Sequence, residues 1–201
     1  MKVELHLHTR RYSACALDSP EQMLAAASDK GYDAVFLTEH DTVWPKDRLD
    51  GLARNFPDLL ILPGLERTIR DQHLLILGTS DEAWLSMTRL GPIFARARKA
   101  DCLTILAHPF RWAGGADMLY ADLGLPDAIE QCTGNQQGRA SQQAAEEAAT
   151  LSLPTVFASD AHSTTMLGQF WIETQRDFQT GGQLREIILA GQYTNCSARS
   201  A

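Results

Sequence analysis

The N-terminal stretch Met1–Thr9 reads M-K-V-E-L-H-L-H-T, which is typical of a strand that ends in two closely spaced histidines. Side chains of an extended strand alternate between its two faces, so His6 and His8 are expected on the same side, opposite Leu5 and Leu7. Two imidazoles in this arrangement can bind one metal ion. An isolated H-x-H pair is nevertheless more often a chance feature of a surface strand, so the other histidines decide between the two interpretations.

The other four histidines also stand at or beside the ends of apolar runs. They occur in the motifs T-E-H-D, H-L-L-I-L-G, A-H-P and S-D-A-H, and the carboxylates of Glu66 and Asp160 are placed in the same way. A single histidine is more often a hydrogen-bonded core residue than a ligand, but six of six at such positions are hard to explain by packing. Zn, Mn and Fe accept mixed imidazole and carboxylate ligands, and hydrolytic sites often hold two or three ions. The sequence therefore predicts a metal site formed by His6, His8, His40, Glu66, His73, His108, Asp160 and His162.

Apolar runs of strand length alternate with helical patterns along the chain. Besides the first strand, strands are expected at residues 34–38, 59–65, 73–77, 103–107, 127–132 and 155–159. Helices are expected at residues 20–30, 46–55, 81–100, 140–150 and around 184–188. Alternation of this kind implies parallel strands joined by right-handed crossovers. About seven strands, with polar residues gathered at their ends, favour an α/β barrel over an open doubly wound sheet.

Local signals refine the expected boundaries. Ser19-Pro20 predicts a helix start, with serine as the cap, proline at the first helical position and Gln22 three residues after the cap. Gly91-Pro92 is expected to break the helical pattern of residues 81–100. Pro63 predicts an irregular strand end just before Glu66. Residues 110–125 have the composition of a loop.

The composition is that of one globular domain spanning residues 1–201, with a formal net charge of -7 and an isoelectric point near 5.3. The acidic balance argues against a nucleic-acid partner, but bound cations would reverse the charge locally for a small phosphorylated substrate. The four cysteines include no C-x-x-C pair, which favours free thiols in a reducing cytosol. The sequence shows no N-terminal signal segment, and no apolar run approaches the ~20 residues of a membrane helix. We therefore expect a cytoplasmic protein without membrane contact.

Taken in order, the motifs H-L-H-T, T-E-H-D, P-G-L-E, H-L-L-I-L-G, A-H-P and S-D-A-H resemble those of the polymerase and histidinol phosphatase (PHP) domain family. The resemblance covers nearly the whole chain and is specific as a set, although each motif alone is weak. It implies a distorted seven-stranded (β/α)7 barrel that holds two or three divalent ions, Zn, Mn or Fe. It also implies the hydrolysis of phosphate esters.

The same resemblance implies how the residues divide among the ions. The first ion would be bound by His6, His8, Glu66 and Asp160, and the second by Glu66 as a bridge together with His73 and His108. A third would be bound by His40 and His162 alone, because this chain has Ala14 where many members carry a further Asp or His ligand. Cys15 or Asp18 could substitute only if the loop bends suitably. The residues expected to act directly in catalysis are Glu66, Asp160 and His162.

Two cations that share a carboxylate lower the pKa of a bridging water, so that hydroxide forms near neutral pH, and they polarise a phosphoryl oxygen. A phosphate group also needs cationic hydrogen-bond donors, which arginine supplies best. Four arginines lie within a few residues of the ligands: Arg10, Arg11, Arg67 and Arg111. Substrate binding is expected from Arg10, Arg67 and Arg111.

Several neighbouring residues have two open interpretations. Glu39, Asp41 and Glu130 could orient the ligating histidines through hydrogen bonds, or they could be ordinary charges at strand ends. Trp112 could line a pocket or stack on a base, but a plain packing role is the simpler expectation.

These patterns predict a metal-dependent phosphoesterase that hydrolyses a small phosphorylated metabolite or nucleotide through a metal-bridging hydroxide. Two alternatives stay open. One is a non-catalytic or regulatory metal-binding PHP module, which Ala14 favours. The other is a nuclease acting on oligonucleotide ends. Two features count against it: the acidic charge balance, and the lack of a basic stripe interleaved with aromatic residues.

Overall fold

Nine strands form one sheet in the computed structural model, which describes residues 1–112 and 124–198. Their order across the sheet is β7-β6-β5-β4-β3-β2-β1-β8-β9. The strands are β1 (Lys2–Leu7), β2 (Ala34–Leu37), β3 (Leu60–Ile69), β4 (Gln72–Leu77), β5 (Leu103–Ala107), β6 (Ala128–Cys132), β7 (Thr155–Phe157), β8 (Phe170–Thr174) and β9 (Tyr193–Ser197). The helices in the described ranges are α1 (Pro20–Asp29), α2 (Lys46–Asn55), the 3-10 helix η1 (Glu82–Ser86), α3 (Leu90–Lys99), α5 (Arg139–Leu151) and α6 (Gly181–Leu189).

The strand directions are mixed, so the prediction of all-parallel pairing is wrong in part. β1, β2 and β3 are parallel to one another, as are β5, β6 and β7, but β4 is antiparallel to both of its neighbours and β8 is antiparallel to β1 and β9. The link between β3 and β4 is too short for a crossover helix, so these strands form a hairpin. The predicted count of seven misses β8, in which buried residues alternate with more exposed ones, and β9, which has no buried residue; neither contains a continuous apolar run.

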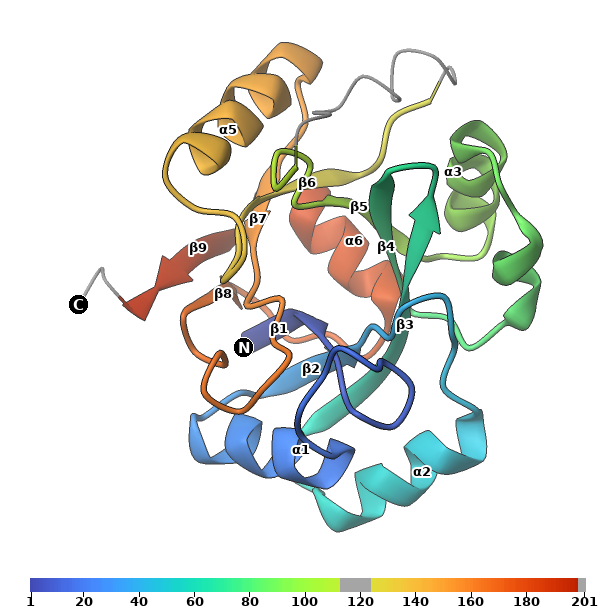
Figure 1. Cartoon of the computed structure of the whole chain (residues 1–201), viewed down its shortest axis with the longest axis vertical. Helices are drawn as coiled ribbons and strands as arrows, with labels where there is room; N and C mark the ends of the chain where they lie inside the picture. Colours follow the sequence, from blue (N-terminus) through green and yellow to red (C-terminus); the bar gives the residue numbers. More distant parts are fainter. Residues whose placement is uncertain (113–123, 199–201) are drawn as a thin grey trace.

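The two ends of the sheet meet, which makes the barrel nearly closed (Figure 1). Side chains of β9 contact the backbone of β7: Tyr193 Oη donates to the carbonyl of Thr155 at 2.6 Å, and Asn195 Nδ2 donates to the same carbonyl at 2.9 Å. Asn195 Oδ1 in turn accepts from the N–H of Phe157 at 2.9 Å. The predicted α/β barrel is therefore confirmed, with nine strands in place of seven.

Helix α6 fills the inside of the sheet. One apolar cluster joins its buried residues to inward-facing residues of eight strands, β1 to β8, and Figure 1 shows the helix in the middle of the ring of strands. Helices α1 and α2 cover the outer face over β1 to β3, whereas α3 and α5 cover β3 to β6. None of the helices in residues 1–112 and 124–198 is both long and apolar enough to cross a membrane.

Several predicted boundaries hold and others shift. Ser19 caps α1 in a full capping box with Gln22, as predicted. β3 does not end at Pro63 but continues through Glu66, because the ladder to β2 is kept and a second ladder to β4 begins at Gly64. The break in residues 81–100 falls between η1 and α3, and Gly91-Pro92 lies in the first turn of α3, where a proline costs no hydrogen bond. Most of the predicted 110–125 loop lies outside the described residues.

The strict alternation expected along the first strand also fails at its end. The pairing of β1 with β2 shifts register between Glu4 and Leu7. As a result Leu5 packs inside the barrel, whereas Leu7 joins the apolar cluster under α1 and α2.

We expect Gly181→Ala to lower the free energy of unfolding by about 1–3 kcal/mol, because a new side chain there meets backbone rather than a flexible neighbour. A Cβ on Gly181 would lie 2.8 Å from the Cα of Gly78 and 2.9 Å from the carbonyl carbon of Leu77. The matched variant is Gly51→Ala inside α2, where the nearest atom is Arg54 Nη2 at 3.8 Å and alanine should stabilise the helix by roughly 0.5–1 kcal/mol. Urea unfolding measures both, and equal changes would contradict the close seating of α6 on β4.

Candidate metal centre

The six histidines, Glu66 and Asp160 gather at one edge of the sheet, although they come from six different strands or the segments that follow them. His6 lies near the end of β1, His8 follows that strand directly, and His108 follows β5 directly. His73 stands near the start of β4, not at a carboxyl end. Because β4 runs antiparallel to β3 and β5, its beginning reaches the same edge, and His73 pairs across the ladder with Ala107.

The carboxylate of Glu66 is the centre of the cluster and is fully buried. Its Oε1 lies 2.7 Å from His73 Nδ1 and 3.0 Å from His108 Nε2. Its Oε2 faces three further imidazoles, at 2.9 Å from His40 Nδ1, 3.2 Å from His8 Nε2 and 3.3 Å from His6 Nε2. One carboxylate thus faces five of the six histidines, each oxygen toward a different group.

The carboxylate of Asp160 closes the cluster from the opposite side. Its Oδ1 lies 3.4 Å from Nε2 of both His6 and His8. Its Oδ2 accepts a hydrogen bond from Asn135 Nδ2 at 2.8 Å and faces Arg111 Nη1 at 3.4 Å. Asp160 and His108 both have positive φ, 48° and 27°, so the chain accepts backbone strain to aim these two side chains inward.

Two buried oxygens in this cluster have no hydrogen-bond donor among the described residues: Glu66 Oε2 and Asp160 Oδ1. Leaving a buried carboxylate oxygen unpaired is costly. The atoms that surround them are imidazole nitrogens, which in the neutral form can also act as electron-pair donors to a metal. Divalent cations would satisfy both kinds of atom at once, so the side chains present fit a metal centre.

Donor atoms fall into four groups in which every atom lies within 4.8 Å of the others. The groups are His6–His8–Asp160, His6–Glu66–His108, His40–Glu66–His73 and His8–His40–His162. They share members, which is the arrangement expected of a polynuclear site and not of separate single-ion sites.

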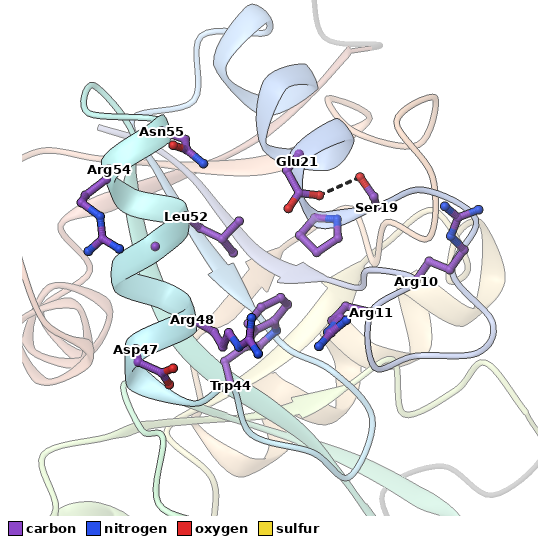
Figure 2. A pocket seen from close by; sticks show the side chains of 12 residues that line it. Arg10, Arg11, Ser19, Glu21, Trp44, Asp47, Arg48, Leu52, Arg54 and Asn55 are labelled. Carbon is purple, nitrogen blue, oxygen red and sulfur yellow. Dashed lines mark hydrogen bonds between the residues drawn. The ribbon is translucent and has the colours of Figure 1, made fainter.

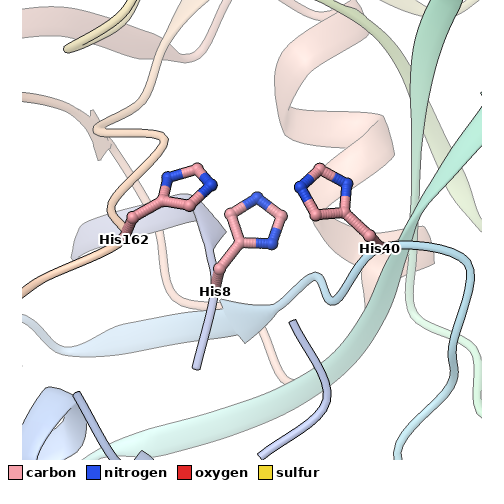
Figure 3. Close-up of side chains that lie close together, drawn as sticks. All are labelled: His8, His40 and His162. Carbon is pink, nitrogen blue, oxygen red and sulfur yellow. The ribbon is translucent and has the colours of Figure 1, made fainter. Parts of the chain in front are cut away.

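The group of three histidines differs from the sequence-based expectation. In Figure 3 His8 lies between His162 and His40, with ring centroids 4.4 Å and 4.3 Å from its own. The donor group of the expected third ion therefore contains three imidazoles instead of two, because His8 lies beside both His40 and His162. Ala14 is exposed, so the group closes without it.

Neither substitute ligand suggested for Ala14 takes part in these groups. Asp18 Oδ2 accepts the N–H of Thr164 at 2.8 Å, which ties the first loop to the segment after Asp160. Cys15 is exposed.

Two of the three neighbouring carboxylates hold the histidines in place. Glu130 Oε1 lies 3.0 Å from His6 Nδ1, which leaves Nε2 of that ring facing the cluster, and Glu130 Oε2 accepts the N–H of His108 at 3.0 Å. Glu39 accepts from Ser13 Oγ, which itself lies 3.3 Å from His8 Nδ1. Asp41 is different, because its carboxylate pairs with Arg67.

Mutual electrostatics keeps the carboxylates ionised despite their burial. Burial opposes the charged form of Glu66, but the charge of His6 and the adjacent imidazoles of His108 and His40 hold its pKa well below the usual range. Burial likewise opposes protonation of His6, yet Asp160, Glu66 and Glu130 raise its pKa well above normal. Burial and the neighbouring His8 lower the pKa of His162 to about 4. The cluster is thus an anionic centre surrounded by imidazoles, which is the environment that divalent cations prefer.

The three arginines expected to bind substrate lie in three different places. Arg111 alone approaches the cluster, at Asp160. Arg67 is buried, and its guanidinium is held by Asp41 and by the carbonyl of Met87 at 3.2 Å. Arg10 lines a separate pocket that contains none of the eight cluster residues.

Trp112 is not packed in the core as expected; it is 54% exposed. Its ring stands edge-on to His73 and His108, at centroid distances of 5.4 and 5.8 Å, and lines a pocket of about 440 Å³ beside them. Asn135 was missed, because a lone asparagine after a strand carries no sequence signal until its contact with Asp160 is seen.

We expect Glu130→Gln to weaken metal binding by about 10- to 100-fold, because the amide cannot accept from both His6 and the His108 backbone as a carboxylate does. The matched control is Glu82→Gln, an exposed residue of η1. Competition against a fluorescent chelator measures the affinity. Equal affinities for both variants would show that Glu130 does not position the histidines.

Comparison with known proteins bears on the fold that carries this cluster. A family model described as PHP-associated (PHP_C) matches residues 138–193, which cover α5, β7, β8, α6 and the first residue of β9. No match was found among the curated proteins.

Among solved structures, the chain resembles a two-domain protein of Bacteroides vulgatus that contains a predicted PHP-like metal-dependent phosphoesterase (TM-score 0.75, 19% identity, 98% of this chain and 64% of that one). It also resembles a proposed metal-dependent phosphoesterase of Bifidobacterium adolescentis (TM-score 0.66, 14% identity, covering 92% of this chain and 94% of that one). A third similar structure is that of PsfC of Pseudomonas syringae (TM-score 0.69, 20% identity, covering 99% of this chain and 92% of that one). The chain spans less than two thirds of the Bacteroides protein.

The nearly closed barrel with a histidine–carboxylate cluster at one edge defines a PHP-like α/β protein with a candidate polynuclear metal centre. The solved structures, at 14–20% identity, show this fold. Together with the family-model match they support the PHP domain family for this chain.

Proposed function

We propose that this protein is a metal-dependent phosphoesterase that hydrolyses a small phosphorylated metabolite or nucleotide. The observation that supports the proposal most directly is the buried carboxylate of Glu66, which faces five imidazoles while one of its oxygens has no donor among the described residues. The Bacteroides and Bifidobacterium proteins, named as phosphoesterases, point to the same chemistry.

The ligands we propose are the eight residues of the cluster, which would hold ions of Zn, Mn or Fe, and Glu66, as a member of two donor groups, would serve more than one ion. When bound, such ions lower the pKa of coordinated water and polarise a phosphoryl oxygen. The remaining roles belong to the chain. Glu66 and Asp160 hold the ligand set together, and Glu130 fixes the ring of His6.

Arg111 is the cation best placed to receive a phosphate group. Its guanidinium is partly exposed and stands between Asp160 and the ring of Trp112, 4.6 Å from the ring centroid. A second donor in the same place is Asn135, which points at Asp160. We propose that His162 acts in catalysis as a neutral metal ligand, because its lowered pKa leaves a ring nitrogen unprotonated and free to bind an ion.

The cytoplasm is the compartment we propose, since all four cysteines are unpaired. The third donor group counts against the non-catalytic alternative, because three imidazoles form that group without a ligand at the position of Ala14. A nuclease remains the second candidate only through the exposed ring of Trp112, on which a base could stack.

Purified protein that has never met a chelator is expected to contain at least two divalent ions per chain, since its side chains form four donor groups that share His6, His8, His40 and Glu66. Elemental analysis measures the content, and turnover of a generic phosphomonoester with added Mn or Zn measures activity. Less than one ion per chain would overturn the metal centre. Two ions without turnover of any phosphomonoester would instead support the non-catalytic module, and cleavage of oligonucleotide ends would support the nuclease.

A further inference from the structure

A second pocket, of about 620 Å³, lies between the loop after β1, the start of α1 and one face of α2 (Figure 2). It shares no residue with the metal cluster and is larger than the pocket beside Trp112. Its volume is within the range of pockets that bind small molecules.

Four arginines from two separate segments line this pocket: Arg10, Arg11, Arg48 and Arg54. In Figure 2, Arg11 and Arg48 point toward the middle of the pocket from its two walls, and Arg10 and Arg54 lie toward its ends. The described part of the chain gives none of the four guanidinium groups an ion-pair partner. For a chain of net charge -7 this is an unusual concentration of unpaired positive charge.

The acidic residues of the pocket do not cancel this charge. Glu21 and Asp47 line it, which leaves an excess of two positive charges. Glu21 accepts from the hydroxyl of Ser19 at 2.9 Å, and Ser19 caps the helix, so the end of α1 is already satisfied. The attraction for an anion therefore comes from the guanidinium groups and not from the helix terminus.

The residues that line the pocket indicate which class of ligand it binds. All four cations are arginines, whose planar forks match phosphate oxygens in pairs. The floor is apolar, formed by Trp44, Leu52 and Pro20. We propose that this pocket binds a small organic anion that carries two or more phosphate groups, held between Arg11 and Arg48 with its carbon part on this floor.

The pocket is also connected to the metal centre by hydrogen bonds. The indole N–H of Trp44 donates to Glu39 Oε1 at 3.1 Å, and Glu39 accepts from Ser13, whose hydroxyl contacts His8. A ligand that moves Trp44 would therefore act on the side chain that orients His8. The binding itself does not depend on the phosphoesterase proposal.

Calorimetric titration with inorganic pyrophosphate tests the proposal, with wild type compared to three variants. The double variant Arg11→Gln/Arg48→Gln should bind at least tenfold more weakly, because two charge-assisted contacts are lost. Arg98→Gln, at an exposed position of α3, should bind as wild type does. His108→Ala separates this pocket from the metal centre and should retain the arginine-dependent binding.

Three outcomes would overturn the proposal. Binding that His108→Ala removes and the double variant keeps would place pyrophosphate at the metal centre. An equal loss in Arg98→Gln and the double variant would mean general charge attraction. Tight, arginine-dependent binding of a single-stranded oligonucleotide, with none of pyrophosphate at millimolar concentration, would make this face a nucleic-acid surface.

Discussion

Glu66→Gln is expected to lower phosphomonoester hydrolysis by about three orders of magnitude, because metal-assisted stabilisation of the transition state is worth several kcal/mol. The change removes the one negative charge that faces five imidazoles, and it affects two of the four donor groups directly. The amide keeps the size of the side chain, so packing inside the barrel should be preserved. Steady-state kinetics and elemental analysis on the same preparation measure the effect.

The control for this variant is Glu82→Gln, which makes the same chemical change on the surface of η1. It should retain full activity and full metal content. If Glu66→Gln kept both as well, Glu66 would be a structural carboxylate and the proposed centre would be wrong. If it lost metal but kept hydrolysis, the reaction would not depend on the ions.

His108→Ala is expected to abolish hydrolysis while the fold remains intact. His108 Nε2 lies 3.0 Å from Glu66 Oε1, whereas its side chain belongs to none of the three apolar clusters. If His108 is a metal ligand as proposed, its loss should reduce activity by at least about a hundredfold. Activity assays, metal analysis and circular dichroism of the variant test the two parts of this prediction separately.

The backbone at His108 supplies a second test. Its φ of 27° is strained for any residue except glycine, so His108→Gly should be more stable than His108→Ala by about 1 kcal/mol while being equally inactive. Thermal unfolding measures the difference. A variant that loses both its fold and its metal would mark His108 as a structural residue, and equal stability of the two variants would mean that the strain is relieved on mutation.

The residue types and their spacing were enough to predict the members of the candidate site. Imidazoles and carboxylates at strand ends are a local signal, and His6, His8, Glu66 and Asp160 all lie in one cluster as expected from it. Helix starts are local too, which is why the capping box of Ser19 and Gln22 was predicted correctly. Strands β8 and β9 were missed, because their half-exposed pattern resembles that of a loop.

The sequence by itself determined the residue types of the candidate metal centre: six histidines and two carboxylates, in motifs that resemble those of the PHP family, on an α/β chain. Only the tertiary structure decided how they are shared. The contact of His6 with Glu130 joins residues 124 positions apart, and the antiparallel direction of β4 brings His73 to the same edge as His108. Which atoms meet across such distances depends on strand register and barrel closure, and these are set by packing around α6 and not by any local pattern.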